Sequence, residues 1–147
     1  MANYTKVLLA LDFHNDNQAI IEKAKKVAAD NHAELALLHV IEPLVMAYAA
    51  NNMSFGQEMV AVQTGVRKNA EARLKEVGAK LGVPDELLLL REGQPAREVH
   101  AAVKEHNVDL IVMGTHGQSG LQLLLGSTAN SVLHGVLCDV LTVRVTD

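Results

Sequence analysis

An apolar run that opens into spaced glycines is the feature that most constrains what this chain can fold into. Asp109-Leu-Ile-Val-Met113 is followed at once by Gly114-Thr-His-Gly117, then by Gly120 and by Gly126-Ser127-Thr128. The run predicts a buried strand, the glycines a loop, and Ser127 the start of a helix. This layout presents unpaired backbone N–H groups to a phosphate. The sequence therefore predicts a nucleotide site, unless the glycines are ordinary turn residues and Ser127 only an N-cap.

Apolar runs and helical patterns alternate along the rest of the chain. We expect strands at 6–11, 34–41, 87–90, 108–113 and 140–145, and helices that begin near residues 15, 57, 95 and 127. One apolar stripe follows the long second helix and consists of Met59, Val62, Val66, Ala70, Leu74, Val77 and Leu81. The segment 42–56 has no clear period and fits a lid, a contact with a partner subunit or a cover for the core edge.

This alternation predicts an α/β fold with a doubly wound, five-stranded parallel sheet in the order 3-2-1-4-5 and helices on both faces. A single domain over residues 1–147 is expected, because no linker or low-complexity stretch divides the chain. Ligands of such sheets bind at the carboxyl ends of the strands, where the winding direction reverses. We therefore expect a crevice between the first and fourth strands, with Asp12 and Gly114 facing each other across it.

Composition narrows the choice of partners. A formal net charge of −4, two Tyr, two Phe and no Trp argue against a nucleic-acid partner, which needs clustered basic side chains and stacking platforms. Cys138 is the only cysteine, so an internal disulfide is excluded and an inert thiol is expected. No histidine pair has the spacing of a metal site. No signal peptide or apolar run of about 18 residues is visible, and we expect a soluble, cytoplasmic protein without a membrane partner.

Two widespread phosphate-binding motifs are absent. The Walker A loop places a lysine after its last glycine, whereas Ser127 follows Gly126. The dinucleotide fingerprint should follow the first strand, yet residues 12–17 contain no glycine. The sequence therefore disfavours both a P-loop NTPase and a nicotinamide dehydrogenase.

Several of these segments, taken together, resemble the universal stress protein family. The resemblance rests on Asp12, on His39-Val40, on Met113-Gly-Thr-His-Gly117, on Gly126-Ser127 and on the closing strand at 138–145, and it covers essentially the whole chain. It implies a cytoplasmic, stress-responsive homodimer that, in one branch of the family, binds ATP or AMP through G-x2-G-x9-G-[ST].

The resemblance places a nucleotide among three strand ends and the glycine loop. By position, Gly114, Gly117, Gly126 and Ser127 would hold phosphates, and Ala10, Asp12 and Val40 would line the adenine and ribose side. The full set of candidate site residues is Ala10, Leu11, Asp12, Val40, Met113, Gly114, Thr115, His116, Gly117, Gly126, Ser127 and Thr128. The expected ligand is ATP or AMP, with or without Mg²⁺. The family's pairing of last strands across a two-fold axis would use Val140, Leu141, Thr142, Val143, Arg144 and Val145.

The loop departs from the family pattern in two ways. Eight residues, 118–125, separate Gly117 from Gly126 instead of nine, and position 118 is Gln where many members carry Arg or Lys. No Lys or Arg lies between Glu105 and Val143, so backbone N–H groups, hydroxyls and a bound Mg²⁺ would have to hold a triphosphate. His116 either contacts phosphate or points outward. We expect His39 to be a satisfied core or crevice residue rather than a metal ligand.

The shortage of cations also bears on catalysis. Phosphoryl transfer uses preorganised cations and a positioned base, and Asp12 is the only nearby carboxylate that the sequence identifies. We therefore expect nucleotide binding with little or no hydrolysis and no catalytic residue. Two other classes stay open: a stress protein of the same fold that no longer binds nucleotide and has an interaction role, and a hydrolytic or adenylyl-transferring enzyme.

Overall fold

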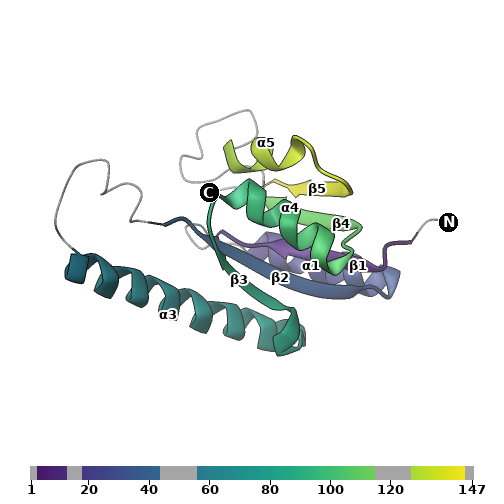
Figure 1. The fold of residues 1–147 in the computed structure, drawn as a ribbon. Coiled ribbons are helices and arrows are strands. Elements are labelled where there is room, and N and C mark those ends of the chain that lie inside the picture. Colours follow the sequence, from purple (N-terminus) through teal and green to yellow (C-terminus); the bar gives the residue numbers. More distant parts are fainter. Residues whose placement is uncertain (1–2, 13–17, 44–55, 115–126, 145–147) are drawn as a thin grey trace.

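Five parallel strands form the centre of the molecule (Figure 1). The structure, a computed structural model, describes residues 3–12, 18–43, 56–114 and 127–144. The strands are β1 (Lys6–Ala10), β2 (Glu34–Ile41), β3 (Leu88–Glu92), β4 (Leu110–Gly114) and β5 (Asp139–Val143). They pair in the order β3-β2-β1-β4-β5, and every pairing is parallel. This result confirms the predicted strand order.

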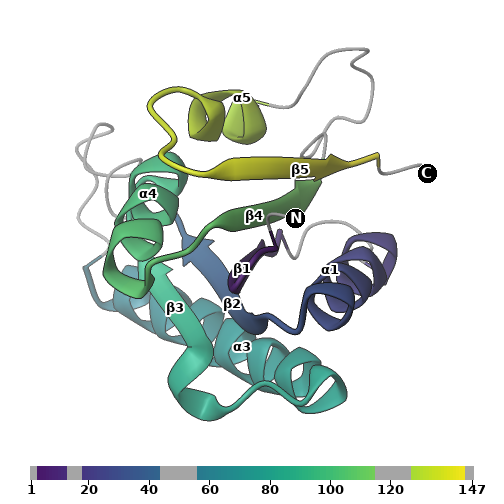
Figure 2. The same cartoon turned by 90° about the vertical axis from the view of Figure 1, so that its right-hand side faces the viewer.

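Helices cover both faces of the sheet (Figure 2). One face carries α1 (Gln18–Asn31) and α3 (Gly56–Leu81), and the other carries α4 (Pro95–His106) and α5 (Ser127–Leu133). A short 3-10 turn, η1 (Asp85–Leu87), precedes β3. The chain winds outward from β1 to β3 and then returns to continue through β4 to β5. Because crossovers between parallel strands are right-handed, this reversal moves the later helices to the opposite face, as predicted.

The core lies on both sides of β1 and β4, the two strands between which the winding direction reverses. Val7, Leu8, Leu9, Ile111 and Val112 have no exposed surface. Strands that are covered on both faces are apolar along their whole length, which explains why these runs show no alternation in the sequence. One face of each helix is buried against the sheet, through Ile20, Ala24 and Ala28 in α1 and Val99, Ala102 and Val103 in α4.

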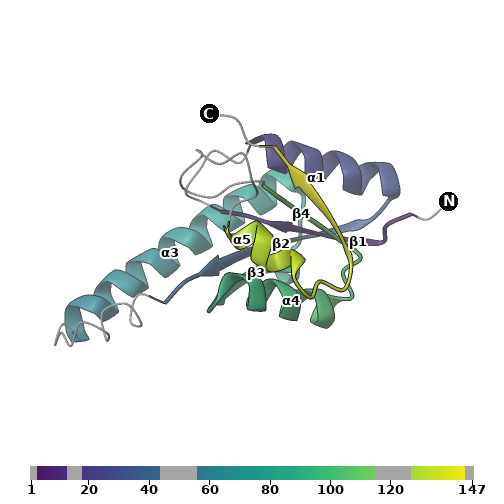
Figure 3. The same cartoon turned by 90° about the horizontal axis from the view of Figure 1, so that it is seen from above.

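The apolar stripe of α3 is buried in only one half of the helix. Ala70 and Leu74 are buried, whereas Val62 and Val66 are 53% and 39% exposed. Figures 1 and 3 show the reason, since the amino-terminal part of α3 extends past the end of the sheet. There Gln63 and Arg67 bind the carboxylate of Glu92 instead, at 3.1 and 2.9 Å. The prediction of one continuous stripe was therefore wrong as a guide to burial.

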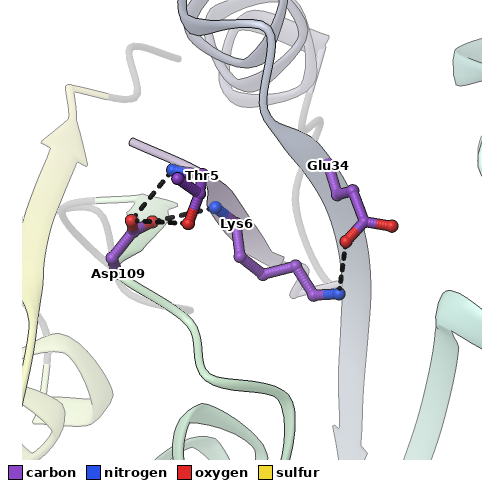
Figure 4. Close-up of polar contacts among 4 residues, drawn as sticks. All are labelled: Thr5, Lys6, Glu34 and Asp109. Atoms are coloured by element: carbon purple, nitrogen blue, oxygen red, sulfur yellow. Dashed lines mark hydrogen bonds and ion pairs between the residues drawn. The ribbon is translucent and has the colours of Figure 1, made fainter. Parts of the chain in front are cut away.

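Some element boundaries differ from the predicted ones. Leu87 belongs to η1 and β3 continues to Glu92, which moves this strand along the chain from 87–90. Similarly, β4 begins at Leu110 rather than at residue 108. The side chain of Asp109, the residue before it, contacts the start of β1. Asp109 accepts hydrogen bonds from the backbone N–H groups of Thr5 and Lys6 and joins β4 to the start of β1 (Figure 4).

The sequence correctly placed the start of α4 but missed its cap. Pro95 is at the first position of the helix, as expected of proline. The side-chain oxygen of Gln94 accepts a hydrogen bond from the Arg97 N–H over 2.8 Å and so satisfies one of the unpaired donors there. At the other end Asn107 adopts the left-handed conformation, with φ 54°. The predicted start of the first helix, near residue 15, lies outside the described residues.

Candidate functional site

The ends of β1 and β4 bring together five of the predicted site residues. Leu9 is in register with Val112, so the next residues of both strands emerge side by side at the carboxyl edge of the sheet. On this edge Ala10, Asp12 and Gly114 are half-buried, while Leu11 and Met113 are buried in the core. The winding direction reverses between these two strands. This is the position at which α/β sheets bind ligands.

Val40 joins this group from the neighbouring strand. Leu38 of β2 is in register with Ala10, which places Val40 two residues further toward the same edge. Its side chain is half-buried. The ends of the three strands therefore lie at the same edge of the sheet, and the assignment of Ala10, Asp12 and Val40 to the adenine and ribose side stays a prediction.

The backbone of Leu11 is held at both of its polar atoms by β2. Its N–H donates to the Leu38 carbonyl over 2.8 Å, and its carbonyl accepts from Nδ1 of His39, also over 2.8 Å. A carbonyl can only accept, so Nδ1 carries the proton in this contact. The expectation that His39 is satisfied by a hydrogen bond is confirmed for this nitrogen. As a result, the chain is fixed immediately before Asp12.

The helix α5 begins at Ser127 as predicted, and Thr128 lies in its first turn. The side chain of Val132 is fully buried, and its carbonyl accepts a hydrogen bond from Nε2 of His100 over 2.7 Å. His100 is a half-buried residue of α4 that the sequence did not single out. It follows Val99 directly in an amphipathic helix, and no spacing in the sequence marks it as a partner of α5.

Four predicted site residues, Thr115, His116, Gly117 and Gly126, lie outside the described residues. The consequence of the shortened glycine spacing therefore stays a prediction. The last strand is described as far as Arg144, and β5 forms the edge of the sheet next to β4. Of the predicted dimer residues, only Val145 falls outside the described part of the chain.

The thiol of Cys138 has the properties of an inert group. Burial raises its pKa, and the negative charges of Asp139 and Asp109 raise it further. A raised pKa keeps the sulfur protonated at neutral pH and therefore weakly nucleophilic. These surroundings agree with the expectation from the sequence.

An open hollow between α3 and β3 is lined by Leu74, Leu88 and Leu90 and by the charged residues Arg67, Glu71, Lys75 and Asp85. Within it, Glu71 and Lys75 pair with each other over 3.6 Å. Within residues 3–12, 18–43, 56–114 and 127–144, no three His, Cys, Asp or Glu side chains gather as metal ligands would. None of the helices in these ranges has the length and apolar character needed to cross a membrane.

The strand order defines a doubly wound α/β protein whose winding direction reverses between β1 and β4, the place at which such sheets generally bind ligands. A model of the universal stress protein family matches residues 3–144, and the chain belongs to this family. It is 38% identical over 146 residues to universal stress protein A homolog 2 of Coxiella burnetii, covering 99% of this chain and 98% of that protein. Homolog 1 of the same organism is 38% identical over 141 residues, or 96% of each chain.

Solved structures share the fold. Hypothetical protein MJ0577 superposes with a TM-score of 0.78 at 22% identity and 99% coverage of both chains. UspA from Lactobacillus plantarum gives a TM-score of 0.68 at 21% identity, covering 98% of this chain and 100% of that one. A universal stress protein in complex with cAMP gives 0.57 at 21% identity, with 97% and 98% coverage. These likenesses show the fold, and the family itself is shown by the family model and by the two relatives from Coxiella burnetii.

Proposed function

We propose that this protein binds an adenine nucleotide, ATP or AMP, at the edge between β1 and β4, and acts in the cytoplasmic stress response as a homodimer with little or no hydrolysis. The observation that carries the proposal is the meeting of Ala10, Asp12 and Gly114 at the point where the strand order reverses. A solved relative of the same fold is in complex with cAMP, which is also an adenine nucleotide.

In this proposal the described residues have separate roles. Asp12 accepts hydrogen bonds from hydroxyl groups of the ribose, and Val40 contacts the adenine. The backbone at Gly114 approaches the phosphates, because glycine has no Cβ to keep them away. Ser127 and Thr128 contribute from the first turn of α5. Mg²⁺ supplies positive charge that the protein lacks between Glu105 and Val143.

Calorimetry with ATP and Mg²⁺ tests the binding. We expect a dissociation constant that is about 10 to 100 times higher for Asp12→Ala, since a hydrogen bond to a charged group contributes about 1.5–3 kcal/mol. Asp30→Ala on the exposed end of α1 is the matched control and should bind as the wild type does. Binding heat that is absent from the wild type would refute the proposal and favour the interaction role instead.

The same preparations test catalysis and assembly. We expect ATP turnover far below the usual range of about 1–10³ s⁻¹, because the protein offers few preorganised cations. Turnover within that range would show an enzyme.

The edge strand β5 is the proposed dimer contact, since an unpaired edge accepts a second copy of itself. Sedimentation at micromolar concentration should give twice the 15.8 kDa of one chain, and a monomer would overturn this part.

A further inference from the structure

Two backbone carbonyls on different elements around the proposed site accept hydrogen bonds from histidine side chains. His39 of β2 donates from Nδ1 to the Leu11 carbonyl over 2.8 Å, and His100 of α4 donates from Nε2 to the Val132 carbonyl over 2.7 Å. Both imidazoles are half-buried. Each therefore joins an element of the site to a neighbouring element that is itself packed in the core.

Both carbonyls lie where regular secondary structure ends. The strand β1 ends at Ala10, so Leu11 lies one residue beyond it. Val132 lies in the last turn of α5, and the last four carbonyls of a helix have no partner within the helix. The histidines thus provide donors at positions where the strand and the helix no longer supply them.

Each carbonyl is also close in the chain to a residue of the proposed site. Leu11 directly precedes Asp12, and α5 begins at Ser127, about 7.5 Å along the helix axis from Val132. A helix of seven residues is not stable by itself, so its position depends on tertiary contacts. For α5 these include the buried side chain of Val132 and the hydrogen bond to its carbonyl.

We infer that His39 and His100 are positioning residues of the nucleotide site, His39 by fixing the backbone before Asp12 and His100 by fixing the helix that begins at Ser127. The inference rests on the proposed function and deepens it. Neither imidazole needs to touch the nucleotide. Each reduces the number of arrangements that the site explores before it binds, and a preorganised site loses less entropy on binding.

Calorimetry with ATP and Mg²⁺ on four variants tests the inference. His39→Leu and His100→Leu remove the donors, and each should weaken binding about five- to tenfold. A fivefold loss equals about 1 kcal/mol, the typical net contribution of one hydrogen bond. His39→Asn and His100→Gln keep an amide N–H near the original ring nitrogen, and both should bind within about threefold of the wild type.

Val103→Ala is the control for a merely structural effect. Val103 is a buried residue of α4, and its truncation lowers the melting temperature without removing either histidine donor. Its dissociation constant at 25 °C should equal that of the wild type. If the two leucine variants bind ATP like the wild type, or if Val103→Ala weakens binding as much as they do, the inference is overturned and the proposed function stands. If the wild type itself binds no ATP, both are overturned.

Discussion

The carboxylate of Asp109 joins the amino ends of β1 and β4, and its replacement gives a quantitative test of what holds these strands together. Oδ2 accepts from the Thr5 N–H at 2.8 Å and from the Thr5 hydroxyl at 3.0 Å, and Oδ1 accepts from the Lys6 N–H at 2.9 Å. Lys6 in turn pairs with Glu34 of β2, so the contact extends across three strands (Figure 4). Asp109→Asn keeps one acceptor oxygen and places an amide group against the remaining donors.

The expected loss is about 2–3 kcal/mol in the free energy of unfolding at pH 7. Hydrogen bonds to charged groups contribute about 1.5–3 kcal/mol each, but Thr5 is exposed and Asp109 only half-buried, so the three together give less than their sum. For a chain of this size the loss equals about 4–12 °C in melting temperature. In urea the unfolding midpoint should fall by about 1 M.

The effect should depend on pH in one direction. Burial by itself raises the pKa of Asp109, but the hydrogen bonds from Lys6 and Thr5 outweigh it and hold the pKa below its usual value. A carboxyl whose pKa is lowered by folding stabilises the protein above its unfolded pKa of about 3.9, and this stabilisation is lost as the pH falls through the lower, folded pKa. The difference between Asp109→Asn and the wild type should therefore be constant from pH 7 to about pH 5 and shrink below that.

Urea titrations at pH 7 and pH 3 measure this difference. Asp30→Asn is the matched control, since it makes the same chemical change in an exposed ion pair with Lys26 and should cost no more than about 0.5 kcal/mol. The reasoning is refuted if Asp109→Asn is as stable as this control at pH 7. It is also refuted if the loss is as large at pH 3 as at pH 7.

Two further predictions concern backbone conformation and the thiol. Replacement by alanine should have opposite effects at Gly65 and Gly135, although an added Cβ meets no atom within 4 Å at either position. Gly65→Ala lies inside α3 and should stabilise the protein by about 0.5–1 kcal/mol. Gly135 has φ 75°, so Gly135→Ala should destabilise the protein by about 1 kcal/mol. Thermal melting measures both, and equal signs would contradict the argument. At pH 8, Cys138 should react with iodoacetamide more slowly than glutathione does, because burial and the charge of Asp139 raise the pKa of its thiol. In urea the unfolded protein and glutathione should react at equal rates. A native protein that reacts as fast as glutathione would refute the prediction.

The sequence predicted the parts of the site that depend on local pattern. Apolar runs located all five strands, and their alternation with helices implied the strand reversal between β1 and β4. Asp12 and Gly114, which follow and end these two strands, could therefore be placed at one edge of the sheet from the sequence alone. The residues His39 and His100 illustrate the limit of this reasoning. Their acceptors lie 28 and 32 residues away in the chain, and a single sequence does not encode such pairs as a spacing.

The helix α3 shows a similar limit. Its stripe of apolar residues has the correct period along the whole helix, but period reports only which side chains share a face. Whether that face meets the sheet depends on where the sheet ends, and β3 ends at Glu92. In the amino-terminal half of α3, Gln63 and Arg67 bind Glu92, so polar contacts replace apolar ones.

By itself, the sequence determined the class of fold, the order of the strands and the family, because these follow from hydrophobic periods and short motifs that any stretch of chain carries locally. Only the tertiary structure decided which half of α3 is buried, which carboxylate joins β1 to β4, and which imidazoles hold Leu11 and α5. Those contacts join residues far apart in the chain, and their energies depend on distances and burial that exist only after the sheet and its helices have come together.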